Sequence, residues 1–194
     1  SFRERIKQLQ DPDVALRDKV LILHDFGFEA GFGDYVQEFI AAGGITELVK
    51  VASGNWPEGG VKGSSLPEDT VVVISPKRHQ SMRRVAWGAL ADMVNYQPYC
   101  EEMSRCGLAA KLPELIKAAV PLYRWGQTYD HMYGHGSSTD QIQYIANRML
   151  SCAAGLVGLM NPAANMVFVA AAAPVMAQVM RMWQTSKEGV NLGE

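Results

Sequence analysis

The stretch of residues 83–119 constrains the fold more than any other part of this chain. Two apolar patterns of helical period lie on either side of the polar turn at 95–98. The pair Cys106-Gly107 then separates the second pattern from a third, which starts at Leu112. Three short helices of this kind cannot bury their apolar faces alone. The stretch therefore predicts an all-α unit that packs against a similar neighbour on each side.

Composition places the chain among ordinary globular proteins and argues against several partners. The chain has 194 residues, of which 48% are apolar and 20% charged, enough for one domain with a real core. A net charge of −2 gives no reason to expect nucleic acid or an anionic membrane, because both need a positive field. The chain starts at Ser1 rather than Met, so we expect a piece of a longer protein.

Three cysteines without a framework spacing favour a reducing compartment. We therefore expect a cytoplasmic protein, with the nucleus as the alternative. Cys100 and Cys106 fall in the second helix of the central unit, where small buried residues are expected. The cysteine, histidine and aspartate residues show no arrangement along the sequence that is typical of a catalytic cysteine, so the sequence suggests no cysteine nucleophile.

Upstream of the central unit, the chain predicts a similar succession of helices. They are expected over residues 1–10, 14–26, 35–42 and 45–51. A glycine-punctuated turn should occupy 27–33, and Gly43-Gly44 should end the third of these helices, as glycines commonly do after a helix.

Two insertions interrupt the helical pattern. Residues 53–75 are rich in glycine, proline and serine, and they include a β-branched run, Val-Val-Val-Ile. We expect a surface loop whose β-branched run packs on the helices, because no second convincing strand is available to pair with it. Ser75-Pro76 should then restart the helix that runs into Arg83. The second insertion, residues 121–139, is aromatic.

The C-terminal part predicts more helix. Asp140 should begin a last long helix whose apolar face includes Ile145 and Met149. Residues 163–180 are nearly all apolar, and their length alone would admit a membrane span. Pro174 interrupts them and no basic cluster flanks them, so a buried hairpin of two helices is favoured.

The same order of signals recurs three times along the chain. Tyr35, Tyr99 and Ala163 each open a second helix, at steps of 64 residues. Each second helix closes on a break of small residues, at 41–45, 105–108 and 171–174. The third helices then read Thr-Glu-Leu-Val-Lys-Val, Pro-Glu-Leu-Ile-Lys-Ala and Pro-Val-Met-Ala-Gln-Val.

This recurrence resembles the armadillo repeat family, and residues 89–116 carry the resemblance best. The resemblance covers about residues 11–183 as three degenerate repeats. Their approximate bounds are 11–52, 76–120 and 140–184, with loops at 53–75 and 121–139 between them. It implies an all-α, right-handed stack of helices in which each repeat touches only its neighbours. Armadillo repeats have about 40 residues, and the two insertions account for the longer step.

In armadillo proteins the third helices line a concave groove that binds extended peptides or a partner's helices. Carried over by position, the groove-lining residues are Glu47, Lys50, Glu114, Lys117, Gln178 and Arg181. The third helices lack the Trp-Asn pair that binders of nuclear-import signals use, which argues against such cargo.

The 121–139 loop combines aromatic side chains with arginine. Its candidate partner-binding residues are Arg124, Trp125, Tyr129 and Tyr133. Aromatic residues and arginine are the usual hot spots of protein interfaces. The same side chains could equally cover the core beneath them, and the sequence leaves both interpretations open.

His131 and His135 in this loop are weak candidates for a metal site. Their spacing would place both imidazoles on one helical face, as metal binding requires. Gly134 and Gly136 argue against a stable helix there, so a polar aromatic loop without metal is favoured.

The leading hypothesis is a non-enzymatic scaffold, without a cofactor, that binds a protein partner through the groove and the 121–139 loop. The alternative is a small-molecule or metal-binding protein, or an enzyme, with a site formed by His131, His135, Tyr129 and Tyr133. A homodimer with a seam at Met166, Phe168 and Met180 is a third hypothesis.

Overall fold

The computed structural model describes residues 1–54, 72–75, 78–119 and 138–159, together with the single positions 170, 173, 174, 177 and 181. The helices in the continuous ranges are α1 (Phe2–Gln10), α2 (Leu16–Ala30), α3 (Val36–Ala41), α4 (Gly44–Ala52), α5 (Met82–Met93), α6 (Gln97–Arg105), α7 (Leu108–Ala119) and α9 (Ser138–Leu159). Two short strands, β1 (Val72–Ser75) and β2 (Arg78–Gln80), precede α5. The described fold is therefore mainly helical, as predicted.

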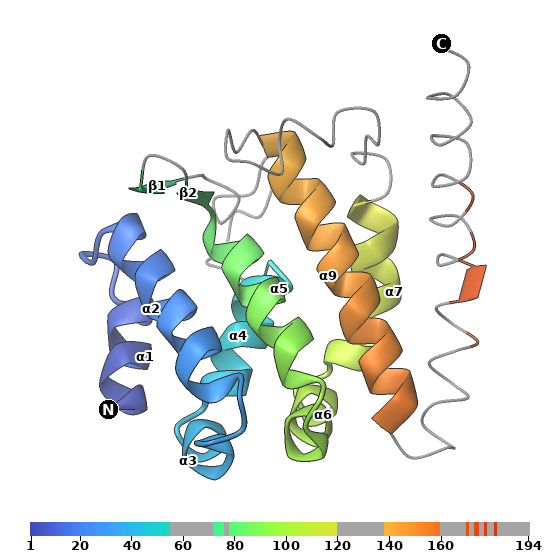
Figure 1. The fold of residues 1–194 in the computed structure, drawn as a ribbon, viewed down its shortest axis with the longest axis horizontal. Helices are drawn as coiled ribbons and strands as arrows, with labels where there is room; N and C mark the ends of the chain where they lie inside the picture. Colours follow the sequence, from blue (N-terminus) through green and yellow to red (C-terminus); the bar gives the residue numbers. More distant parts are fainter. Residues whose placement is uncertain are drawn as a thin grey trace.

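Helices α2, α5 and α9 lie side by side and run in the same direction (Figure 1). Helix α4 packs against α5, and α7 packs against α9. The short helices α3 and α6 lie together at one end of this arrangement (Figure 1). Helices α2–α4 and α5–α7 thus follow one another in the same order, with α5 in contact with both α2 and α9.

The two three-helix units bury equivalent positions. Pairs of residues that lie 64 positions apart and are both fully buried are Leu23 and Trp87, Phe26 and Leu90, Phe39 and Met103, and Leu48 and Leu112. Each of the three helices of a unit therefore turns the same face toward the core as its counterpart does. All of these side chains belong to one continuous hydrophobic core.

The predicted glycine breaks between second and third helices are confirmed. Gly43 and Gly107 have φ angles of +86° and +82°, in the left-handed region that favours glycine. Each donates its backbone N–H at 2.9 Å to the carbonyl three residues earlier, Ile40 and Ser104 respectively. The chain thus changes direction in the same way in both units.

The predicted turn at 27–33 is wrong in its first half, because α2 continues through Gly27 to Ala30. A Cβ placed on Gly27 would lie 3.2 Å from the Cβ of Ala89 on α5. Gly27 therefore lets α2 approach α5 closely instead of ending the helix. The chain turns later, at Gly33, where φ is +88°.

The predicted structure of residues 72–81 is right in part. Val72 and Ile74 pack against the helical core, as predicted. Val72–Ser75 nevertheless has a strand partner: β1 pairs antiparallel with β2, with Val72 opposite Gln80. Helix α5 begins at Met82 rather than after Ser75-Pro76, because Ser81 caps it. The Ser81 hydroxyl accepts a hydrogen bond from the Arg84 amide at 3.2 Å, which satisfies a free donor of the first turn.

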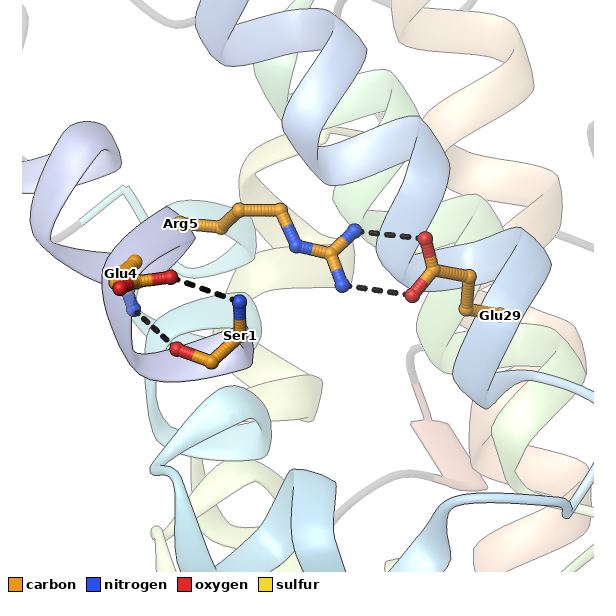
Figure 2. Close-up of polar contacts among 4 residues, drawn as sticks. All are labelled: Ser1, Glu4, Arg5 and Glu29. Atoms are coloured by element: carbon orange, nitrogen blue, oxygen red, sulfur yellow. Dashed lines mark hydrogen bonds and ion pairs between the residues drawn. The ribbon is translucent and has the colours of Figure 1, made fainter.

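Helix α1 is fastened to α2 by a bidentate ion pair (Figure 2). Arg5 donates to both carboxylate oxygens of Glu29, at 2.8 and 2.6 Å. The hydrogen bonds from Arg5 lower the pKa of Glu29 below its usual range. At the start of α1, the Ser1 hydroxyl accepts from the Glu4 amide at 3.3 Å (Figure 2). The ion pair therefore holds α1 against α2, while the cap satisfies a free donor of the first turn of α1.

Tyr99 of α6 ties the second unit to the first and gives a testable pH dependence. Its ring is fully buried and its hydroxyl donates to the Ala30 carbonyl at 2.8 Å. Burial raises the pKa of Tyr99 from 10.0 to about 12. The folded protein therefore keeps a proton that the unfolded chain releases, so this contribution to stability is complete below pH 10.0 and is lost as the pH rises toward about 12.

We expect the Tyr99→Phe variant to lose about 1 kcal/mol at neutral pH, because the Ala30 carbonyl loses its shorter hydrogen bond and keeps the weaker one from the Gly33 amide, at 3.4 Å. The difference in unfolding free energy between the native protein and the variant should then shrink as the pH rises above 10.0. Urea titrations of both proteins at matched pH values measure this difference directly and cancel the titration of other groups. A difference that stays constant with pH would contradict the assignment.

None of the described helices is both long and apolar enough to cross a membrane. Most of the apolar stretch 163–180 lies outside the described residues.

Candidate partner-binding site

A depression of about 400 Å³ lies between α4 and the break that joins α6 to α7. It is lined by Thr46, Val49, Lys50, Ser53, Arg105, Cys106 and Lys111. The first four residues come from α4 and its end, and the last three from the end of α6 and the start of α7. The depression therefore spans the seam between the two three-helix units.

The exposed charges of this depression are positive. The ammonium of Lys50 lies 3.5 Å from a carboxylate oxygen of Glu47, and Arg105 pairs with Glu102. The two carboxylates are largely covered, with side chains 4% and 13% exposed, whereas those of Lys50 and Arg105 are 42% and 68% exposed. Lys111 adds a third cation to the lining. The ammonium and guanidinium side chains are therefore more exposed to solvent than the carboxylates that pair with them.

The wall of the depression is held by a contact across the seam. The Thr46 hydroxyl and the Cys106 thiol lie 3.5 Å apart, within hydrogen-bond range for sulfur. On the α4 side, the Ser53 hydroxyl donates to the Lys50 carbonyl at 3.4 Å. These contacts fix the backbone from which the cations project, and they leave the lining with hydroxyl groups beside the charges.

Only part of the predicted groove lies in this depression. Lys50 is a lining residue. Glu47 is not: it is only 3% exposed, and one of its oxygens accepts from Gln10 of α1 at 2.6 Å. Its other oxygen has no hydrogen-bond partner among the described residues. Glu47 was wrongly predicted to line the groove because the sequence does not reveal that α1 packs over α4.

The remaining predicted positions lie elsewhere. Glu114 is exposed on α7 but is not a lining residue. Lys117 belongs to α7, although its side chain lies outside the described part of the chain. Arg181 occupies an exposed helical position and is not a lining residue. Gln178 and the loop residues Arg124, Trp125, Tyr129, His131, Tyr133 and His135 lie outside the described residues.

Arg105 and Lys111 also line this depression and were not predicted from the sequence. They flank the Cys106-Gly107 break, one at the last position of α6 and the other in the first turn of α7. The third helix of this unit was predicted to start at Leu112, whereas α7 starts one turn earlier, at Leu108, so Lys111 was left outside the predicted helix. The signal that could have found them is the pair of cations on either side of a predicted helix break.

The described residues include no group of three or more His, Cys, Asp or Glu side chains that could hold a metal ion. Cys100 and Cys152 are buried, and burial raises the pKa of both thiols, that of Cys100 to about 11. Since the thiolate is the nucleophile, these two thiols are poorly suited to catalysis at neutral pH. Cys106 was expected to be buried, and it is half-buried. It lies in the wall of the depression.

No family model, curated protein or solved structure matches the chain.

Proposed function

We propose that this protein is an interaction scaffold that holds an extended, acidic segment of a partner protein in the depression between α4 and α7. The observation that carries this proposal is the meeting of Lys50, Arg105 and Lys111 across the seam, with the counter-ions of Lys50 and Arg105 largely covered. Such a surface attracts carboxylates or phosphates and excludes basic segments.

We further propose that the helices form armadillo-like repeats, with α2–α4 and α5–α7 as two of them and α9 as the start of a third. The same order of helices, the equivalent glycine breaks and the burial of positions 64 residues apart support this arrangement. In such a stack the third helices of successive repeats face one side, so a bound segment would pass from α4 to α7.

The lining suits an extended peptide better than a small ligand. The cations come from different elements, so one segment would have to cross the seam to meet all of them. The Arg105 guanidinium offers a planar fork to a carboxylate, whereas the two lysines act as point charges. The hydroxyls of Thr46 and Ser53 can bond to the peptide backbone, and Val49 provides apolar contact between the charges.

A charge-reversal experiment tests the proposal. The probe is a fluorescently labelled peptide of alternating Glu and Ser, with a Lys-Ser peptide as its basic counterpart. We expect the acidic peptide to bind and the basic peptide not to bind. The double variant Lys50→Glu/Lys111→Glu should lower the affinity for the acidic peptide by at least about tenfold, since each lost charged contact contributes on the order of 1 kcal/mol. Binding measured by fluorescence anisotropy should also weaken as salt is added.

The matched control is Lys7→Glu/Arg17→Glu, which makes the same change in net charge at two exposed positions on α1 and α2. It should bind the acidic peptide nearly as well as the native protein does. Equal losses in both double variants would mean that net charge, rather than the depression, attracts the peptide. Binding of the basic peptide, or of neither, would contradict the proposed partner chemistry.

A further inference from the structure

The cationic depression lies where two helices begin directly after a glycine. Helix α4 follows Gly43, and among the described residues no side chain caps its first turn. Helix α7 follows Gly107, which has no side chain that could cap it. Thr46 in the first turn of α4 and Cys106 just before α7 lie 3.5 Å apart, so both helix starts meet at the depression. The first amides of a helix and its dipole favour an anion, and both ends therefore add to the positive potential of the cations.

Helix α4 and its end supply a stripe of hydrogen-bond donors to one wall. Thr46, Val49, Lys50 and Ser53 follow one another at intervals of three, one and three residues, so they lie on the same side of the helix. Two of them carry hydroxyl groups and Lys50 carries an ammonium. These donors therefore succeed one another along the wall.

The opposite wall supplies a guanidinium and a second ammonium. Arg105 has five N–H donors, and Glu102 accepts from Nε and from one terminal nitrogen of its guanidinium. The guanidinium thus has donors beyond those that this ion pair uses. Lys111 follows from the first turn of α7. An anion in the depression can therefore meet charged donors from both three-helix units.

A phosphoryl group matches this lining better than a carboxylate does. It carries a charge of about −1.5 to −2 at pH 7 and three acceptor oxygens, whereas a carboxylate carries a single charge and two oxygens in one plane. Three cations and two hydroxyls on facing walls can approach three oxygens from different directions. With a carboxylate, part of this set would have no acceptor.

We infer that the depression binds a phosphorylated serine or threonine within the acidic segment of the partner. The inference rests on the proposed function and names the group that the cations of the two units hold together.

Two labelled peptides test the inference. The first is the Glu-Ser peptide with its central serine phosphorylated, and the second has glutamate in place of that phosphoserine. In fluorescence anisotropy at about pH 7.5, the phosphorylated peptide should bind at least about tenfold more tightly, because its second charge pairs with a cation that glutamate does not use.

This preference should depend on pH in one direction. Phosphate loses its second charge as the pH falls through about 6, whereas glutamate stays ionised down to about pH 4.3. The preference should therefore shrink as the pH is lowered from about 7.5 to about 5. The charged and titratable groups around the depression act on both peptides, so their own titration largely cancels in the ratio of the two affinities. These groups are Glu47 and Lys50 of α4, Glu102, Arg105 and Cys106 at the end of α6, and Lys111 of α7.

A neutral substitution tests the role of the third cation. Lys111→Gln should remove most of the preference for the phosphorylated peptide, because the second charge of the phosphate loses its partner. Lys7→Gln is the matched control, since it removes one cation at an exposed position of α1. It should leave the preference unchanged, and both variants should keep the circular dichroism spectrum of the native protein.

The other outcomes separate this inference from the proposed function. Equal affinities for the two peptides would overturn the inference and leave the acidic-segment proposal standing, whereas binding of neither would overturn both. Free O-phosphoserine is the competitor. If it displaces the phosphorylated peptide at concentrations near the Kd of that peptide, the depression binds a small phosphate and not a protein segment, which would also overturn the inference.

Discussion

Replacing Trp87 by alanine is expected to remove about 3–5 kcal/mol of folding free energy, a large part of the stability of a domain of this size. The indole is fully buried in the middle of α5. Its N–H donates to the Ala52 carbonyl at 3.0 Å, at the end of α4. The substitution therefore opens a cavity and loses a hydrogen bond at the contact between the two three-helix units.

Urea-induced unfolding, followed by circular dichroism, measures this loss. Trp87→Phe is the matched control, because it keeps most of the aromatic volume and removes only the N–H. We expect a smaller loss from it, since Nε of Arg83 also donates to the Ala52 carbonyl, at 3.3 Å, and leaves that oxygen partly satisfied. If alanine costs less than about 1 kcal/mol, Trp87 does not hold the units together.

Gly44→Leu is expected to destabilise the protein by about 3 kcal/mol or more, because overpacking in a rigid core forces side chains and backbone to move. A Cβ at Gly44 would overlap the ring of Phe39. That ring cannot easily move, since the rings of Phe2, Phe26 and Tyr99 surround it at centroid distances of 5.1, 5.2 and 6.2 Å.

The second unit suggests how this substitution could be rescued. The residues 64 positions after Phe39 and Gly44 are Met103 and Leu108, both fully buried. The flexible methionine leaves room for the leucine, whereas the rigid phenylalanine requires glycine. We therefore expect Phe39→Met/Gly44→Leu to recover part of the stability that Gly44→Leu loses, as measured by urea unfolding.

Gly43→Ala is the control for this pair. Gly43 has a φ angle of +86° and no atom within 4 Å of its potential Cβ, so alanine there should cost about 1–2 kcal/mol of backbone strain alone. Phe39→Met should not recover that loss. Equal recovery at both glycines, or at neither, would refute the proposed coupling between Phe39 and Gly44.

The sequence could predict those parts of the fold that depend on local chemistry. Gly43 and Gly107 end helices because their backbone angles exclude most other residues, and this requirement is visible in one short stretch of sequence. Helices α6 and α7 could be predicted for the same reason, since their apolar spacing and Pro98 are local signals, although α7 starts at Leu108 and not at Leu112 as predicted. Lys50 could be assigned to a helix from the sequence, because the glycines before this short helix mark its start.

The parts that failed depend on contacts between distant segments. Gly27 looks like a helix breaker, and only the approach of Ala89 shows why α2 continues through it. Glu47 looks like a surface residue, and only Gln10 of α1 reveals that it is covered. The strand pairing at Val72 needs a partner with weak strand character of its own, so local propensity could not identify it.

Helix α5 contacts α2, α4 and α9, so it can open only when its neighbours on both sides also open. Local opening in such an arrangement begins at the flanks, where an element has packed neighbours on one side only, and reaches the centre last. The amides of α5 should therefore belong to the slowest-exchanging group of the molecule. Because α5 contacts all three helices, a displacement that tilts α5 must also move α2, α9 and α4. Helix α4 lines the cationic depression, so a movement of α2 or α9 can reach that depression through α5.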